Sequence, residues 1–133
     1  MEISTPQVTL AAYQSDPSVP ARGALSLIHE MWGLVEHIKG VADRFSAEGY
    51  LVLAPDLLSG VGVDPELGQE LQNLTFSTDE VKRAEAQPLV REKLAPARSP
   101  EYCQWAVAAL TAVDDRLSSQ AGVGEHVVVA VSF

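Results

Sequence analysis

The chain has 133 residues, 47% of them apolar, and a formal net charge of −9. This length fits one domain with one hydrophobic core, and the apolar fraction argues against a disordered chain. The acidic side chains are spread along the sequence, which argues against binding to a nucleic-acid backbone, because that requires clustered lysine and arginine.

The N-terminus carries no recognisable secretion signal, because MEISTPQVTL lacks both the basic start and the long apolar core of a signal peptide. The longest apolar runs are far too short to span a bilayer. Cys103 is the single cysteine, so an internal disulfide is impossible, which fits a reducing compartment. We therefore expect a soluble cytoplasmic protein that binds neither a membrane nor nucleic acid.

The first predicted element is a strand over residues 7–13 (QVTLAAY), followed by a turn over residues 14–22 that contains Asp16-Pro17 and Pro20. We expect this pair to form an edge hairpin that leads into the next strand, over residues 23–29.

Residues 23–55 predict a complete strand–helix–strand unit. An apolar strand over residues 23–29 is followed by a loop and then by a helix over residues 36–48. Gly49 fits the left-handed end of that helix, and a second apolar strand over residues 50–54 stops at Pro55. Such a unit implies parallel strands joined by a right-handed crossover. The predicted apolar helix face consists of Ile38, Val41, Ala42 and Phe45.

The middle of the chain is harder to assign. Residues 56–65 predict a loop, and its SGVG is no phosphate loop because the GK[ST] ending is absent. Residues 66–74 favour a short helix, and a second helix begins near residues 77–80, where acidic residues favour a first turn. We expect Pro88 to interrupt this second helix.

Two clear elements follow. Ser99-Pro100-Glu101 starts a helix, with proline near the first helical position. Residues 126–133 (HVVVAVSF) form a continuous apolar strand, which is typical of the middle of a parallel sheet that is buried on both faces. The predicted buried face of the helix consists of Tyr102, Trp105, Ala106, Ala109, Leu110, Val113 and Leu117.

Three motifs carry a resemblance to a known family: HEMWGL at residues 29–34, AEGY at 47–50 and LVLAPDL at 51–57. At this separation they resemble the N-terminal half of the dienelactone hydrolases, a family of α/β-hydrolases. The resemblance implies an α/β fold with three layers, in which helices flank a mostly parallel sheet that starts with an N-terminal edge hairpin. Residues 1–133 would then be a single, incomplete (truncated) α/β-hydrolase half-domain, with an irregular helical region at 66–98.

Ser132 is the predicted nucleophile. In α/β-hydrolases the nucleophile follows a central strand in a G-x-S-x-G turn. The resemblance aligns Ser132 with it, with Ala130 in place of the first glycine and serine in place of the cysteine that the family commonly has. From the local residues alone, an ordinary strand residue is the favoured alternative for Ser132, and only the resemblance favours the nucleophile. A serine needs a base, and in this fold the acid and the histidine follow the nucleophile, so we expect the chain to be inactive by itself.

The resemblance also implies an oxyanion hole formed by the backbone N–H groups of Met31 and Phe133, because negative charge developing on a carbonyl oxygen needs preorganised donors. It further implies that Glu30 is the acidic residue that contacts the resting nucleophile. The alternative for Glu30 is an acid that stabilises the start of the following helix.

The three histidines differ in position. His29 ends a strand at the edge where open α/β sheets bind ligands, and it is the only histidine that the topology places near Ser132. A packing role in the loop is the favoured alternative for it. His37 falls in the first turn of a helix, and His126 starts a strand at the opposite end of the sheet from Ser132.

The remaining polar and aromatic candidates predict no metal site and no cofactor. Asp56 follows Pro55 without a second carboxylate at ligand spacing, which favours a turn-forming aspartate. Trp32 can line a pocket, although packing is the favoured role. Cys103 has no basic neighbour in the sequence that would lower its pKa, which favours an inert thiol.

Two functions remain open. The first is hydrolysis of a small ester or lactone through Ser132, which needs a completing segment. The second is a non-catalytic folded fragment or a self-associating interaction module. In that case the apolar strand at residues 127–133 leaves an edge that another strand can pair with, most simply in a symmetric homodimer.

Overall fold

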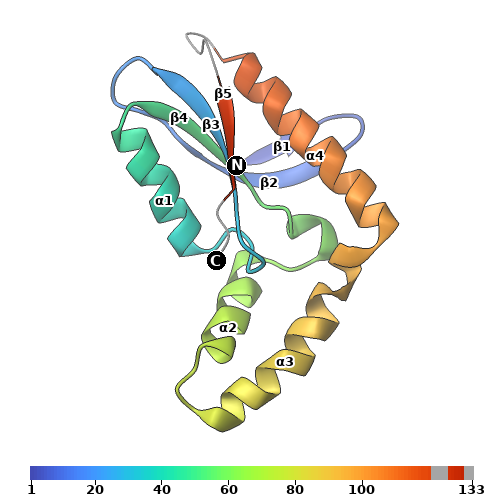
Figure 1. The fold of residues 1–133 in the computed structure, drawn as a ribbon. Coiled ribbons are helices and arrows are strands. Elements are labelled where there is room, and N and C mark those ends of the chain that lie inside the picture. The colour runs from blue at the N-terminus through green and yellow to red at the C-terminus, as the bar shows by residue number, and fades with distance from the viewer. Residues whose placement is uncertain (121–125, 131–133) are drawn as a thin grey trace.

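The computed structural model describes residues 1–120 and, for the last strand, the backbone of residues 126–130. Five strands form one sheet in the order β1-β2-β4-β3-β5 (Figure 1). Their bounds are β1 Glu2–Ser4, β2 Thr9–Ser15, β3 Gly23–Ile28, β4 Tyr50–Pro55 and β5 His126–Ala130.

The centre of the sheet is parallel, as the sequence predicts. Strand β3 pairs with β4 on one side, from the Gly23–Tyr50 pair onward, and with β5 on the other, up to the Ile28–Ala130 pair. Helix α1 (Glu36–Ala47) connects β3 to β4, so the predicted strand–helix–strand unit is confirmed. The chain leaves α1 through Gly49, whose φ of +99° is a conformation that favours glycine.

The N-terminal edge hairpin exists, but its strands differ from those that we expected. Strand β1 pairs antiparallel with β2, and β2 pairs antiparallel with β4 rather than with β3. Both edges of β3 are already occupied, by β4 and β5, so β2 must join the sheet further out. A strand of three residues is too short to leave a period-two pattern, which is why the sequence did not reveal β1.

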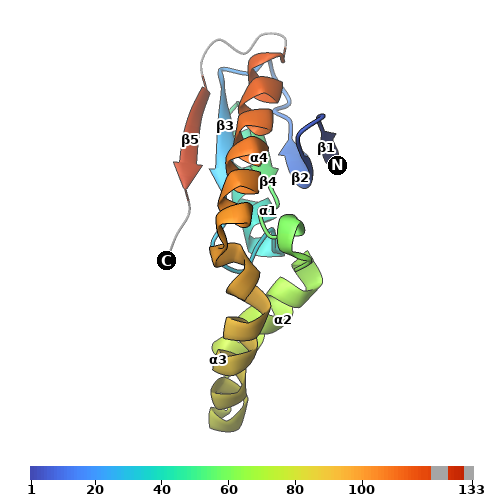
Figure 2. The same cartoon turned by 90° about the vertical axis from the view of Figure 1, so that its right-hand side faces the viewer.

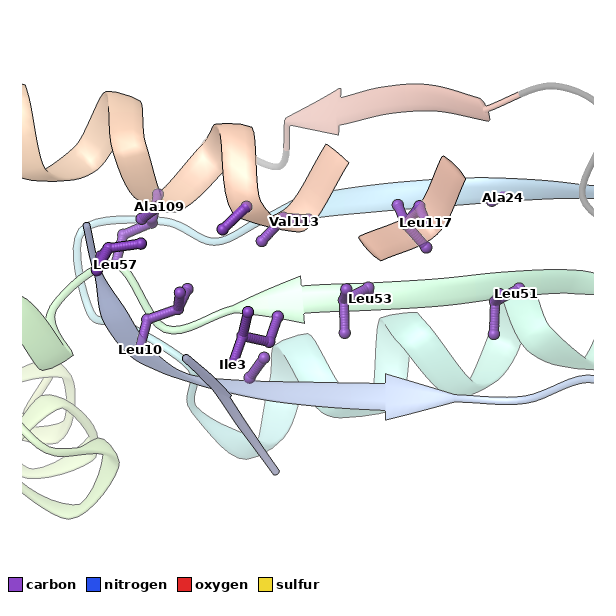
Figure 3. Packing of buried hydrophobic residues seen from close by; sticks show 12 residues of the cluster. Ile3, Leu10, Ala24, Leu51, Leu53, Leu57, Ala109, Val113 and Leu117 are labelled. Atoms are coloured by element: carbon purple, nitrogen blue, oxygen red, sulfur yellow. The ribbon is translucent and has the colours of Figure 1, made fainter. Parts of the chain in front are cut away.

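Two apolar clusters lie on opposite faces of the sheet. Alternate residues of β4 separate them, because successive side chains of a strand point to opposite faces. Leu51 and Leu53 pack toward helix α4 (Pro100–Ser118), as Figure 3 shows, while Val52 and Ala54 join the cluster that α1 covers. The predicted α/β fold with flanking helices is therefore confirmed, and its sheet is mixed rather than purely parallel.

Helix α4 contacts the sheet along a narrower stripe than we predicted. Leu110, which we expected to be buried, is 38% exposed. Leu110 lies off the face on which the buried residues of the helix recur about once per turn. They are Ala109, Ala112, Val113 and Leu117.

Helices α2 (Pro65–Thr75) and α3 (Glu80–Leu94) form a hairpin that extends beyond the end of the sheet (Figure 2). Each begins with an aspartate cap: Asp64 accepts a hydrogen bond from the Leu67 N–H, and Asp79 accepts one from the Val81 N–H. The predicted interruption at Pro88 is wrong, because α3 continues through it. Pro88 is exposed, so the carbonyl that it leaves without an N–H partner lies on the solvent side of the helix.

A 3-10 turn (Ala95–Arg98) joins α3 to α4. Within residues 1–120 and 126–130, no helix combines the length and the apolar character that a membrane span requires.

Candidate active site

The parallel strands end at one common edge of the sheet. The loop from His29 to Val35 follows β3 there, and the turn that begins at Asp56 follows β4. Strand β5 reaches the same edge, because Ala130 pairs with Ile28, the residue directly before His29. Open α/β sheets bind their ligands at this edge, so the loops here are the first place to look for a site.

His29 binds the backbone through both ring nitrogens. Its Nε2 accepts a hydrogen bond from the Leu57 N–H at 2.9 Å, so the ring proton lies on Nδ1, which donates to the Glu30 carbonyl. Burial lowers the pKa of His29, which favours this neutral ring. His29 therefore links the loop after β3 to the loop after β4, as the packing alternative expects.

Glu30 and Met31 lie in a tight turn. The Gly33 N–H donates to the Glu30 carbonyl at 3.2 Å, and Gly33 has a φ of +85°. Met31 is 53% exposed. Among residues 1–120, the Glu30 carboxylate has no hydrogen bond or ion pair. The alternative role for Glu30 at a helix start loses its basis, because α1 begins only at Glu36.

The loop after β4 is held by two buried polar groups. Asp56 is 2% exposed, and its Oδ1 accepts a hydrogen bond from the Leu58 N–H at 3.1 Å, which confirms the predicted turn-forming role. Burial raises the pKa of Asp56. From α4, the Tyr102 hydroxyl donates to the Leu57 carbonyl at 3.0 Å, and burial raises the pKa of Tyr102 as well.

Two neighbouring cavities open beside this edge and share Glu30, Met31 and Arg98. The larger, about 660 Å³, is lined by Glu30, Met31, Trp32, Thr75, Phe76, Gln87, Val90, Arg91 and Arg98. The smaller, about 330 Å³, is lined by His29, Glu30, Met31, Leu57, Leu58, Leu94, Ala97, Arg98 and Tyr102. The predicted site residues Glu30 and Met31 thus form one wall, and the α3 side of the hairpin forms the other.

A still larger hollow, about 970 Å³, lies between α1 and α2. Its lining is mainly charged and polar and includes none of the predicted site residues. The smaller cavities at the sheet edge are the better candidates, because the strand ends converge there.

The sequence did not point to Arg91, Arg98 or Tyr102. All three come from α3, the 3-10 turn and α4, and no local motif marks them. Only the tertiary arrangement of these three elements brings them to the cavities that Glu30 lines.

Trp32 is 5% exposed and packs edge-on against Phe76, with ring centroids 6.0 Å apart, and it also lines the larger cavity, so it has both of the roles that the sequence left open. Cys103 is exposed on α4. The predicted nucleophile Ser132 and the predicted donor Phe133 lie outside the described residues. Within the described part of the chain, no three His, Cys, Asp or Glu side chains gather closely enough to hold a metal ion.

Comparison with known proteins decides the family. The sequence profile described as "Dienelactone hydrolase family" matches residues 10–124. The chain belongs to the dienelactone hydrolase family. Three curated relatives match shorter segments. They are "Putative carboxymethylenebutenolidase" of Saccharolobus solfataricus (42% identity over 48 residues), "Putative hydrolase fragment YghX" of Escherichia coli K12 (46% over 59) and "Protein usf" of Aquifex pyrophilus (37% over 60).

These matches cover 36%, 42% and 43% of this dienelactone hydrolase family member and 18%, 50% and 26% of the respective relatives. Solved structures extend the likeness to the whole chain. A crystal structure from Klebsiella pneumoniae, named "Putative Dienelactone Hydrolase", superposes with a TM-score of 0.64 at 23% identity, and a second structure, "m3DLH", with 0.55 at 19%. They cover 99% and 100% of this chain, which spans 47% of each of theirs. At these identities the likeness establishes the fold.

Proposed function

We propose that this chain supplies the nucleophile side of an active site that hydrolyses a small ester or lactone, with Ser132 as the nucleophile. Family membership supports the reaction class. The observation that carries the proposal is the register of β5: Ala130 pairs with Ile28, and the chain beyond Ile28 forms the Glu30–Met31 wall of the cavity. Ser132 follows Ala130 by two residues.

In the proposed reaction, the Ser132 Oγ attacks the carbonyl carbon and its proton passes to a base. The charge that develops on the carbonyl oxygen is stabilised by the N–H groups of Met31 and Phe133. The bond to the leaving oxygen then breaks, that oxygen takes the proton, and an acyl–serine ester remains. Water hydrolyses this ester and restores the hydroxyl. In the resting state, the Glu30 carboxylate accepts the hydroxyl hydrogen bond.

His29 is a poor candidate for the base, because its two ring nitrogens are hydrogen-bonded to the backbone. We therefore propose that a segment other than residues 1–133 completes the site with a histidine and an acid. The chain by itself should then hydrolyse esters far more slowly than the completed site does.

The charge around the cavity favours one class of substrate. The side chains of Arg91 and Arg98 line the cavity opposite Glu30, and both are exposed. We propose that they bind a carboxylate on the substrate, since guanidinium groups pair with carboxylates through two parallel hydrogen bonds. No cofactor is part of this proposal.

The test compares hydrolysis of a nitrophenyl ester by the wild-type chain and by the Ser132→Ala variant. Slow turnover that disappears in the variant supports a Ser132 nucleophile. Equal rates in the two proteins argue against it and favour the non-catalytic alternative, which the comparisons do not support. A nitrophenyl ester with a carboxylate on the acyl group, beside a neutral one of equal size, measures the contribution of the two arginines.

Self-association is a separate proposal. Strand β5 is last in the sheet order and pairs with β3 alone among residues 1–120 and 126–130, so its other edge can accept a strand. We propose that two copies pair through β5 in a symmetric dimer in the cytoplasm. Light scattering at low micromolar concentration tests this, and a stable monomer would contradict it.

A further inference from the structure

We infer that His29 is a positioning residue that aims the Met31 N–H into the active site. This inference rests on the proposed oxyanion role of Met31. The peptide group that joins Glu30 to Met31 is planar and trans. In such a group the carbonyl and the N–H point in opposite directions, so whatever fixes the Glu30 oxygen also fixes the direction of the Met31 N–H.

Two donors hold that oxygen. One is the Nδ1–H of His29, and the other is the Gly33 N–H at 3.2 Å. Both lie on the oxygen side of the peptide group, so the Met31 N–H is left on the opposite side. Among the residues that the structure describes, this N–H has no acceptor, and Met31 itself lines both cavities. A free donor held in a fixed direction beside a cavity is what an oxyanion hole requires.

The imidazole ring is itself held in place. The Leu57 N–H donates to Nε2 at 2.9 Å, which fixes both the ring orientation and the tautomer that puts the proton on Nδ1. The Leu57 carbonyl in turn accepts the Tyr102 hydroxyl at 3.0 Å. A chain of hydrogen bonds thus runs from α4 through the loop after β4 to the Glu30–Met31 peptide. Tyr102, Leu57 and His29 can therefore orient the Met31 N–H without touching the substrate.

Two substitutions separate the two bonds of His29. His29→Asn keeps an amide N–H about where Nδ1 lies and loses the acceptor for Leu57. His29→Gln reaches about as far as Nε2, so it can accept from Leu57 but loses the donor to Glu30. If His29 acts through the Glu30 carbonyl, the glutamine variant should lose more activity than the asparagine variant. His37→Gln, at an exposed position on α1, is the matched control.

The first measurement is NMR of the wild-type chain labelled with ¹⁵N, and it needs no activity. We expect His29 protonated on Nδ1 and unprotonated on Nε2. The Met31 amide resonance should shift in His29→Gln, shift less in His29→Asn and stay unchanged in His37→Gln. A proton on Nε2 in the wild type, or a Met31 resonance that is the same in all four proteins, would overturn the inference. A proton on Nε2 in the wild type overturns the inference even if the variants do not fold.

The second measurement is ester hydrolysis. We expect His29→Gln to lower kcat by about 10²-fold with little change in KM, the size associated with loss of one oxyanion donor. A rise in KM at constant kcat would overturn the positioning role. If the wild type shows no turnover that depends on Ser132, the proposed function fails on this chain, while the NMR result still decides whether His29 fixes the peptide.

Discussion

The strand–helix–strand unit and the helical hairpin of this chain differ in how much of each is buried. In the unit of β3, α1 and β4, most strand residues are buried and each strand is paired along its length. In the hairpin, α3 buries only Ala86 completely, and α2 buries only Gly68 and Leu71. Figure 2 shows the hairpin reaching past the sheet, and most residues of α3 are exposed.

The sheet unit carries most of the stability, and the hairpin shapes the site. Buried apolar area is the main favourable contribution to folding, so the sheet unit should unfold last. The hairpin contributes less to stability, yet Arg91 and Val90 of α3 line the cavity. A site with one wall on each region needs the hairpin to stay docked, so substitutions that loosen the hairpin should also disturb the site.

Replacing one leucine in each region should separate the two regions most clearly. Leu53 of β4 is fully buried, whereas Leu89 of α3 is only partly buried. Leu53→Ala should lower the free energy of unfolding by about 2–5 kcal/mol, the usual range for a core leucine, and Leu89→Ala by about 1 kcal/mol. Urea unfolding followed by circular dichroism measures both. Equal losses would mean that the hairpin is as much a part of the core as the sheet.

The next effect contrasts two glycines inside helices. A Cβ on Gly68 of α2 would lie 1.9 Å from the Trp32 carbonyl oxygen, whereas a Cβ on Gly40 of α1 would meet no atom within 4 Å. Gly68→Ala should therefore push α2 off the loop after β3 and destabilise the protein by about 1–3 kcal/mol. Gly40→Ala should stabilise it by up to about 1 kcal/mol through helix propensity.

Thermal melts of the two glycine variants give the stability change, and Trp32 fluorescence, measured in a Trp105→Phe background, reports on the docking of the hairpin. We expect the two substitutions to act in opposite directions. A neutral Gly68→Ala variant with unchanged fluorescence would show that α2 does not need the close approach, which would remove the main tie between the two regions.

A weak pH dependence of stability is expected at the junction of the two regions. Burial lowers the pKa of His29 below its usual 6.5. At a pH between the lowered pKa and 6.5, the imidazole is therefore protonated in the unfolded chain and neutral in the folded chain. The His29 contribution to stability is therefore complete above pH 6.5 and is lost as the pH falls through the lowered pKa. Asp56 acts in the opposite sense, because its raised pKa favours folding below pH 3.8 and loses that effect as the pH rises.

Urea unfolding at pH 7.5 and 5.5 measures this dependence. The wild type should lose more stability between these values than His29→Gln, and the difference between the two proteins at each pH reports on His29 together with its electrostatic coupling to Asp56. His37→Gln is the control and should follow the wild type. The same slope in the wild type and in His29→Gln would contradict the neutral, buried ring.

The fold was predictable wherever an apolar pattern of helix or strand type was bounded by a glycine or a proline. The strand over residues 23–28, the helix that begins at Glu36 and the strand that ends at Pro55 all lie within a residue or two of the prediction. The pairing of β2 was not predictable, since it depends on which edge of the sheet is still free. The interruption predicted at Pro88 was wrong because a helix tolerates a proline where the carbonyl that loses its partner is exposed to water.

Only one wall of the candidate site, the loop after β3, was predictable from the sequence. The HEMWGL motif indicated Glu30 and Met31, and the structure places both on the cavity wall. The opposite wall comes from residues whose role depends on the hairpin geometry, so no local pattern could mark Arg91 or Arg98. Likewise, the backbone partners of His29 come from Glu30 beside it and from Leu57, which only the parallel pairing of β3 and β4 brings near.

The tip of the hairpin, between Ser77 and Asp79, has a practical consequence. It joins two helices that are each anchored separately, α2 through Leu71 in the apolar cluster and α3 through the 3-10 turn that runs into α4. A protease that cuts at this tip should leave two fragments that remain associated, each carrying one wall of the cavity. The same place should accept an inserted reporter domain, and its signal would then follow the separation of the two walls directly.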